Sequence, residues 1–389
     1  MLISVVTETF WPEINGVAMT LHRLVTGLIA RGHRVQLVCP HLSDRPVVEL
    51  PAEVSYHPVR GCPLPGYKDV NIGFPSKKYL KNLWLSARPD VIYVATEGPL
   101  GWSAAQEANR QDIPVTSGFH TNFHSYSRHY RLGYLEKIAR RYLTAMHNKT
   151  VTTIVPTVEQ KHMLQAMGIQ HVSIMGRGVD TGLFSPAKRS LALRKQWGVS
   201  AGDPVVLYVG RTAEEKNLGL TIQTYYQLRQ LNNRIKFVLV GDGPLLKKLK
   251  KEHPSFIFAG SRTGEDLAAH YASADIFLFS SLTETFGNVI LEAMASGLGV
   301  VAFDYAAAHM HISPNENGVL VKTDEELEFI HKAKFLLQNE LLLKKIRTNA
   351  DKYAKKQSWQ EIVEQFENIL VNYYANDQVD WKQKLESVS

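Results

Sequence analysis

Residues 275–295 read DIFLFSSLTETFGNVILEAMA, and this stretch decides the fold. Its apolar start predicts a buried strand, and Gly287 opens a helix that runs to residue 295. Glu284 therefore lies on the loop at the carboxyl end of the strand, and Glu292 lies one turn inside the helix. In an open α/β sheet this edge binds ligands, and the free N–H groups of a helix N-terminus bind anions. Two carboxylates beside such a helix indicate a ligand with hydroxyls and phosphates, such as a nucleotide-sugar.

Composition limits the class of protein. The 389 residues are 44% hydrophobic and 21% charged, which fits a globular protein of two ordinary domains. Only two cysteines occur, so we expect neither a disulfide framework nor a metal site. Glu8 interrupts the N-terminus too early for a secretory signal, and no apolar run is long enough to span a membrane. We expect a cytoplasmic protein, free or at the inner face of the cytoplasmic membrane.

The chain contains two runs of short apolar strands that alternate with helices. The first run starts with a strand at Leu2–Thr7 and a helix from about Gly16 to Arg31, and the second starts at Pro204–Gly210. Nearly unalternated apolar strands between helices predict parallel sheets covered on both faces. We therefore predict an α/β fold of two doubly wound, Rossmann-like domains that face each other across a cleft. The predicted domains are an N-terminal domain of residues 1–180 and a nucleotide-sugar-binding domain of residues 181–357, with a C-terminal helix within about 358–389 packing back on the first.

Two cations follow the first strand of the second run. Arg211 and Lys216 lie in the loop GRTAEEKN, residues 210–217, where that strand passes to a helix. An arginine fork and a lysine point charge can together bind a diphosphate and stabilise it as a leaving group. The alternative is a solvated turn in which Lys216 pairs with Glu214 or Glu215. The acidic loop in the same sheet favours the diphosphate site.

The order and spacing of these segments resemble the family-4 glycosyltransferases. The resemblance covers nearly the whole chain, and its motifs are specific as a set. It rests on the segments GR and EKN within residues 210–217, VGDGP at 240–244, YASAD at 271–275, the pattern E…FG…EAMASG at 284–297, NGV at 15–17, GVD at 178–180 and FSP at 184–186. The resemblance implies the two-domain glycosyltransferase-B fold and retention of the anomeric configuration.

The resemblance also implies donor-binding roles in the second domain. Arg211 and Lys216 would hold the donor diphosphate. Glu292 would accept hydrogen bonds from the ribose hydroxyls, and Glu284, a predicted catalytic residue, would contact hydroxyls of the transferred sugar. The main-chain amides that would meet the sugar and phosphates belong to Phe286, Gly287, Asn288 and Val289.

Two positions of the first domain complete the predicted site. Gly16 follows the first strand, where a backbone without a side chain can approach the donor, although a simple turn is the alternative. His120, in the segment GFHTNFH at residues 118–124, would lie near the transferred sugar and the acceptor, and is the second predicted catalytic residue. His124 and His129 fit surface positions better than ligand positions.

Three positions depart from the family pattern. Arg177 stands where many members have asparagine, Gly299 replaces a common proline, and YAAA at residues 305–308 replaces frequent paired glycines. Arg177 is similar to a subset that includes bacterial lipid mannosyltransferases and diacylglycerol glycosyltransferases. This departure favours a lipid acceptor.

The first half of the chain is basic. Residues 1–183 carry 19 Lys/Arg and 13 Asp/Glu, whereas residues 184–389 carry 25 and 24. Residues 120–150 hold six Lys/Arg, one acid and five aromatics, a pattern that suits peripheral contact with an anionic membrane or with nucleic acid. A helix with its tyrosines in the core and its arginines solvated is the structural alternative. The family resemblance favours a lipid or glycan acceptor at a membrane, and no nucleic acid is expected.

These observations predict a retaining, metal-independent hexosyltransferase. It would move a mannose- or glucose-type sugar from GDP-mannose or a UDP-hexose to a membrane glycolipid of diacylglycerol or phosphatidylinositol type. No Asp-x-Asp triplet and no His/Cys array at metal spacing occur, so Arg211 and Lys216 would neutralise the diphosphate and no cofactor is expected. One alternative keeps the fold and makes the protein a sugar-nucleotide epimerase or a phosphorylase. Another is a non-catalytic basic adaptor for membranes or nucleic acid.

Overall fold

The computed structural model describes residues 1–13, 15–40, 50–64, 67–120, 133–200, 202–284 and 286–386. The chain divides into two compact units, which are considered one at a time. Unit 1 consists of Met1–Arg177 with Trp359–Ser389, and unit 2 consists of Gly178–Ser358.

Strands and helices alternate in both units. Those of unit 1 are β1 (Leu2–Val6), α1 (Gly16–Ala30), β2 (Arg34–Pro40), β3 (Val54–Val59), β4 (Gly61–Leu64), β5 (Tyr67–Gly73), α2 (Lys77–Ser86), β6 (Val91–Val94), α3 (Pro99–Arg110), β7 (Val115–Gly118), α5 (Gly133–His147), β8 (Thr152–Val155), α6 (Val158–Ala166), β9 (Val172–Ile174) and α15 (Trp359–Glu386). Those of unit 2 are η1 (Pro186–Lys188), α7 (Leu191–Gln196), β10 (Val205–Val209), η2 (Glu214–Lys216), α8 (Leu218–Leu231), β11 (Lys236–Val240), α9 (Leu246–Glu252), β12 (Ile257–Gly260), α10 (Gly264–Ala272), β13 (Ile276–Phe279), α11 (Asn288–Ala295), β14 (Gly299–Phe303), α12 (Ala306–His311), β15 (Val319–Val321), α13 (Glu326–Gln338) and α14 (Glu340–Ala354).

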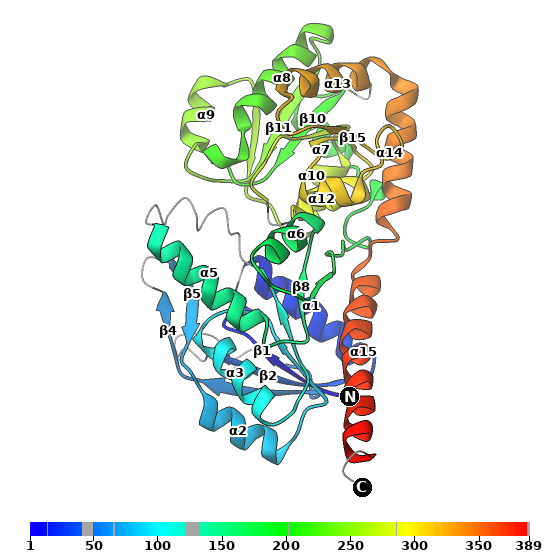
Figure 1. Ribbon diagram of the computed structural model, residues 1–389. Helices are drawn as coiled ribbons and strands as arrows, with labels where there is room; N and C mark the ends of the chain where they lie inside the picture. Colours follow the sequence, from blue (N-terminus) through cyan, green and yellow to red (C-terminus); the bar gives the residue numbers. More distant parts are fainter. Residues whose placement is uncertain are drawn as a thin grey trace. The chain divides into compact units, whose positions relative to one another are not determined.

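Each unit is built on a parallel sheet, which confirms the predicted pair of Rossmann-like domains (Figure 1). The strand order is β3-β2-β1-β6-β7-β8-β9 in unit 1 and β12-β11-β10-β13-β14-β15 in unit 2. The order reverses once in each sheet, between β1 and β6 and between β10 and β13. Doubly wound sheets bind ligands at this switch point, outside the carboxyl ends of the strands. The switch points therefore locate the candidate site in each unit.

Both faces of each sheet are covered by helices, as unalternated apolar strands require. In β10, Val205, Leu207 and Val209 enter one core, which α10, α11 and α12 complete. Val206 and Tyr208 enter the other core, with α8, α9 and α13. In unit 1, α1 and α15 pack on one face, and α2, α3 and α5 pack on the other. Such two-sided burial fixes the sheet, and the loops at its edges are held in place by it.

The C-terminal helix belongs to unit 1. Ile362, Phe366 and Leu370 of α15 are buried in the same core as α1. Glu367 accepts hydrogen bonds from Arg31 Nε and, at 2.7 Å, from His33 Nε2. These contacts lie just beyond the C-terminal end of α1, and the two helices pack side by side (Figure 1).

Asp275, the residue before β13, organises a charge cluster in unit 2. Its Oδ1 accepts from Arg189 at 2.9 Å and from Arg347 at 3.1 Å. Its Oδ2 accepts from Arg194 at 3.2 Å and from the Val205 amide at 2.9 Å. Arg194 is only 2% exposed, and the Asp275 carboxylate balances its buried positive charge.

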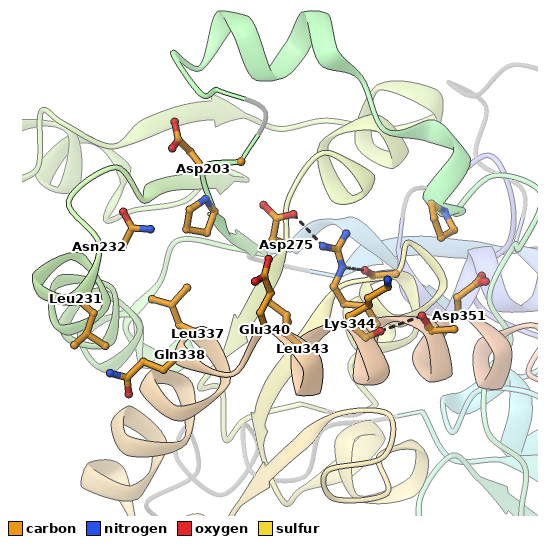
Figure 2. A pocket seen from close by; sticks show the side chains of 16 residues that line it. Asp203, Leu231, Asn232, Asp275, Leu337, Gln338, Glu340, Leu343, Lys344 and Asp351 are labelled. Carbon is orange, nitrogen blue, oxygen red and sulfur yellow. Dashed lines mark hydrogen bonds and ion pairs between the residues drawn. The ribbon is translucent and has the colours of Figure 1, made fainter.

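A pocket of about 820 Å³ opens beside this cluster (Figure 2). Its lining includes Asp203 before β10, Asp275 before β13, Asn232 after α8, and residues of α14 such as Lys344. In a parallel sheet these positions mark the amino ends of the strands. The pocket therefore lies at the edge opposite to the predicted donor residues, and the candidate site must be sought at the other edge.

We predict that Asp275→Asn destabilises the protein by about 3 to 5 kcal/mol, because it leaves Arg194 buried without its counter-charge. Urea unfolding followed by circular dichroism should show a lower midpoint. Asp324→Asn, at an exposed position, serves as the control and should change stability by less than about 0.5 kcal/mol. Equal midpoints for the two variants would contradict the stabilising role of Asp275.

Candidate active site

The two loops at the switch point of unit 2 meet through an ion pair. Lys216 ends η2 after β10, and its Nζ lies 2.5 Å from Oε1 of Glu284 in the loop after β13. Both side chains are mostly buried, with 17% and 16% exposed. The neighbour Glu215 pairs instead with Arg211, at 3.2 Å. The interpretation of Lys216 as a lysine paired with Glu214 or Glu215 is therefore wrong, because the strand order brings a carboxylate from the next loop closer.

Arg211 combines a main chain held by a hydrogen bond with an exposed side chain. Tyr208, buried in β10, donates its hydroxyl to the Arg211 carbonyl at 3.1 Å. The guanidinium itself is 65% exposed, and its pair with Glu215 is a surface contact. Surface pairs of this kind contribute little to stability, so the Arg211 side chain can leave Glu215 for an anionic ligand at small cost.

The helix α11 begins with its amides open to a ligand. Gly287 precedes it with φ of 93°, a left-handed conformation that favours glycine, and no side chain caps the helix. The first N–H groups of a helix lack partners inside it, so Asn288 and Val289 present amides at this end. Phe286 is buried and packs its ring against His311. The uncapped start of α11 is compatible with the predicted anion-binding role of these amides.

Glu292 faces a buried tyrosine. Tyr271, in α10, donates its hydroxyl to Glu292 Oε2 at 2.8 Å and has no exposed surface. Burial raises the pKa of Glu292 to about 6, and the hydrogen bond from Tyr271 limits the rise. One carboxylate oxygen of Glu292 is thereby fixed in place. Sequence reasoning missed the role of Tyr271, although the residue begins the YASAD motif.

Two departures from the family pattern have visible consequences in unit 2. Ala306 adopts φ of 51°, the conformation that glycine favours, and the next amide, of Ala307, donates to the Phe286 carbonyl at 2.9 Å. A β-carbon on Gly299 would lie 2.5 Å from Leu343 Cδ1, so a larger residue there would require the Leu343 side chain to shift. The turn that supports the donor loop is therefore retained with alanine, at some backbone strain.

The remaining predicted residues lie in unit 1, at the carboxyl edge of its sheet. His120 follows β7, and its Nε2 lies 3.1 Å from the hydroxyl of Tyr93 in β6. Gly16 begins α1, whose first turn is capped by the side chain of Asn15. A β-carbon on Gly16 would lie 3.5 Å from Nη1 of Arg177. The structure thus brings His120 and Gly16 together around Tyr93 and Arg177, two residues that were not among the predicted site residues.

A buried carboxylate at the switch point of unit 1 was also missed. Glu8 follows β1, and its Oε1 accepts from the Leu100 amide in the first turn of α3 at 3.2 Å. Burial raises the pKa of Glu8 to about 7; hydrogen bonds from Leu100 and Gly73 oppose the rise, and Glu97 adds to it. The sequence signal was weak, because a single glutamate after a strand has no spacing pattern.

The basic segment at residues 120–150 is described only in part, since residues 121–132 lie outside the described ranges. In α5, Lys137, Arg140 and Arg141 are exposed, whereas Tyr142 stacks on Trp102 with ring centroids 4.9 Å apart. Tyr142 also donates to the Glu97 carbonyl at 2.8 Å. For this part of the helix the arrangement is that of a packed tyrosine with solvated cations.

Within the ranges that the structure covers, no helix has both the length and the apolar character to cross a membrane. The same ranges contain no group of three or more His, Cys, Asp or Glu side chains arranged to hold a metal ion.

Comparisons with known proteins agree with this geometry. Residues 14–183 match the model of Glycosyltransferase Family 4, and residues 203–339 match that of Glycosyl transferases group 1. The chain is 31% identical over 332 residues to a GDP-mannose-dependent alpha-mannosyltransferase of Mycobacterium tuberculosis, covering 83% of this chain and 84% of that protein. It is 24% identical over 346 residues to the alpha-monoglucosyldiacylglycerol synthase of Streptococcus pneumoniae, covering 84% and 76%.

A solved structure shares the fold. Anabaena Alr3699/HepE in complex with UDP superposes with a TM-score of 0.74 at 20% identity, covering 96% of this chain and 100% of that one. The fold is therefore the glycosyltransferase-B fold. The family matches and the Mycobacterium tuberculosis relative show that the chain belongs to Glycosyltransferase Family 4 and is a glycosyltransferase.

Proposed function

We propose that the enzyme transfers mannose from GDP-mannose to a hydroxyl of a membrane lipid, with retention of configuration. The observation that carries the proposal is the meeting of Lys216 and Glu284 beside the open N-terminus of α11, with Glu292 one turn further on. This arrangement offers a cation, free amides and carboxylates to one ligand. The Mycobacterium tuberculosis relative supports GDP-mannose as donor, and the Streptococcus pneumoniae relative supports a diacylglycerol-type acceptor.

The proposed chemistry uses these groups in separate tasks. Lys216 and Arg211 take up charge on the diphosphate oxygen as its bond to the anomeric carbon breaks. Glu284 accepts hydrogen bonds from the sugar hydroxyls, and Glu292 accepts from the ribose. The acceptor oxygen forms its bond to the same carbon on the face that the diphosphate leaves, and its proton passes to the departing diphosphate.

We propose that the reaction needs no metal ion or other cofactor. A divalent cation on a diphosphate leaving group supplies positive charge. Lys216 and the exposed Arg211 can supply this charge from the loop after β10, where they already face carboxylates.

We further propose that the enzyme works in the cytoplasm and contacts an anionic membrane surface through α5. The exposed cations Lys137 and Arg141 of this helix, with Lys149 just beyond it, flank Ile138, whose exposed fraction is 47%. Cations near an anionic surface each contribute about 1 kcal/mol of attraction, which an exposed apolar side chain supplements.

Lys216→Ala should reduce mannosyl transfer by about a hundredfold or more, because a leaving-group charge loses its preorganised partner. The assay measures radiolabelled mannose transferred from GDP-mannose to a lipid extract. It is run with and without EDTA, because removal of divalent metal ions should leave the wild-type rate within about twofold if no metal is required. Lys188→Ala is the control, since Lys188 pairs with Glu265 on the surface. Near-normal transfer by Lys216→Ala would falsify the donor site, and loss of wild-type transfer in EDTA would refute metal independence.

Glu292 should make donor binding sensitive to acid. Because its raised pKa lies at about 6, the carboxylate becomes protonated as the pH falls through this value and accepts hydrogen bonds less well. The dissociation constant of GDP, measured by calorimetry, should therefore rise below about pH 6 by up to tenfold per pH unit. Tyr271→Phe removes the bond that limits the pKa, so its rise should begin at higher pH. Tyr225→Phe, which removes a hydroxyl bonded to a main-chain carbonyl, should behave as wild type.

Membrane contact should depend on α5 in particular. Replacement of Lys137, Arg141 and Lys149 by glutamine should weaken sedimentation with phosphatidylglycerol vesicles by roughly a hundredfold, and raised salt should weaken it for the wild type. The matched control replaces Lys247, Lys248 and Lys251 of α9, three exposed lysines in unit 2, and should bind as wild type. Equal losses in both variants would show a non-specific charge effect and reject α5 as the contact.

A further inference from the structure

Tyr93 and Gly118 pack closely around the imidazole of His120. Tyr93 has no exposed surface, and its hydroxyl reaches His120 Nε2 at 3.1 Å. A β-carbon on Gly118 would lie 2.3 Å from this hydroxyl and 2.7 Å from Nε2. Only glycine at position 118 therefore permits the contact. The carboxyl end of β7 is shaped around a tyrosine–histidine pair.

Arg177 adds a buried positive charge to this pair. It follows β9, lies beside Gly16, and acts electrostatically on both Tyr93 and His120. Burial lowers the pKa of Arg177, yet a guanidinium remains charged in proteins. Burial, the Arg177 charge and His147 together lower the pKa of His120 to about 3. The imidazole is therefore neutral at physiological pH, with one N–H.

The charges decide where that hydrogen lies. Arginine has donors only, so its field turns the lone pairs of the Tyr93 oxygen toward it and the hydroxyl hydrogen toward His120. Burial raises the pKa of Tyr93, so the phenol keeps its hydrogen. Nε2 then accepts, and the imidazole hydrogen lies on Nδ1. Nδ1 is buried and has no hydrogen-bond partner among the described residues.

We propose that Tyr93 and Arg177 are positioning residues that hold His120 as the neutral Nδ1–H tautomer. In this state His120 neither takes up nor releases a proton during transfer. The transfer itself rests on the proposed function, whereas the tautomer rests on unit 1 alone. Two residues outside the predicted site thus determine what the predicted histidine can do.

The other charged groups near His120 fit this assignment. His147 of α5 is buried, which lowers its pKa to about 4, so it adds no charge at neutral pH. Glu97, after β6, lies 4.0 Å from His147 Nε2. Burial thus keeps His120 neutral with the Arg177 charge adding to its effect, and Tyr93 supplies the direction of the imidazole hydrogen.

The test is nitrogen-15 NMR of the full chain labelled at its 15 histidines, with His120→Gln identifying the signal. Wild-type His120 should show a protonated Nδ1, an unprotonated Nε2 and no titration between about pH 5 and pH 9. In Tyr93→Phe the His120 signal should no longer show a single tautomer. The kcat should fall about tenfold, which is the effect of one misdirected hydrogen bond, and the donor KM should stay unchanged. Gly118→Ala should reproduce this spectrum by forcing the pair apart. Tyr225→Phe is the matched control and should leave the spectrum as in the wild type.

Arg177 is tested by charge. Arg177→Gln should allow His120 to titrate at higher pH, because a repelling cation has been removed, so kcat should fall on the acid side of the profile. Arg177→Lys should restore the wild-type spectrum and profile. The variants need not all fold, since the wild-type spectrum alone decides the tautomer.

The outcomes separate this inference from the proposed function. A wild-type His120 that is protonated at Nε2, or that titrates near neutrality, overturns the inference even if mannose is transferred. The expected spectrum without transfer from GDP-mannose supports the inference and overturns the proposed donor.

Discussion

The pairing of β10 with β13 is the constraint on which the donor site depends. The strand order reverses at this pair, so the helices that follow the two strands leave toward opposite faces and their loops remain side by side. Lys216 and Glu284 are 68 positions apart in the chain and are brought together only by this register. The apolar residues of β10, buried on both faces, fix the register.

The ion pair is also a reason for the site to be ready before a donor arrives. Lys216 is buried enough that an unpaired charge there would be costly, and Glu284 satisfies it in the free enzyme. Under the proposed roles, a bound diphosphate would offer Lys216 a stronger partner, and sugar hydroxyls would offer Glu284 new donors. Donor binding would then exchange one set of partners for another, without exposing either charge. Arg211, held only on the surface, is the part that can move toward the ligand.

The sequence predicted the positions of strands and loops better than the contacts between their side chains. The runs at residues 205–209 and 276–279 were identified because buried parallel strands are apolar throughout. Strands β3, β4, β5 and β15 were not predicted. Of these, β3 and β4 each contain a proline, which is uncommon inside strands. The second contact of each site residue depends on three-dimensional register, so neither the Lys216–Glu284 pair nor the role of Tyr271 could be deduced from spacing. From sequence alone, a tyrosine such as Tyr271 is assigned to the core, because the partner of its hydroxyl is known only from the structure.

The two units use a buried tyrosine for the same physical task. Tyr271 donates to Glu292 in unit 2, and Tyr93 meets His120 in unit 1. Burial raises the pKa of both phenols, so each remains a neutral donor. A neutral donor orients a titratable partner without adding a charge that a ligand would have to compete with. A lysine or arginine in place of Tyr271 would neutralise the charge of Glu292, and one in place of Tyr93 would add a positive charge beside His120. Phenylalanine at either position would leave the partner free to rotate. A buried phenol thus fixes one atom of its partner without adding a charge to the site.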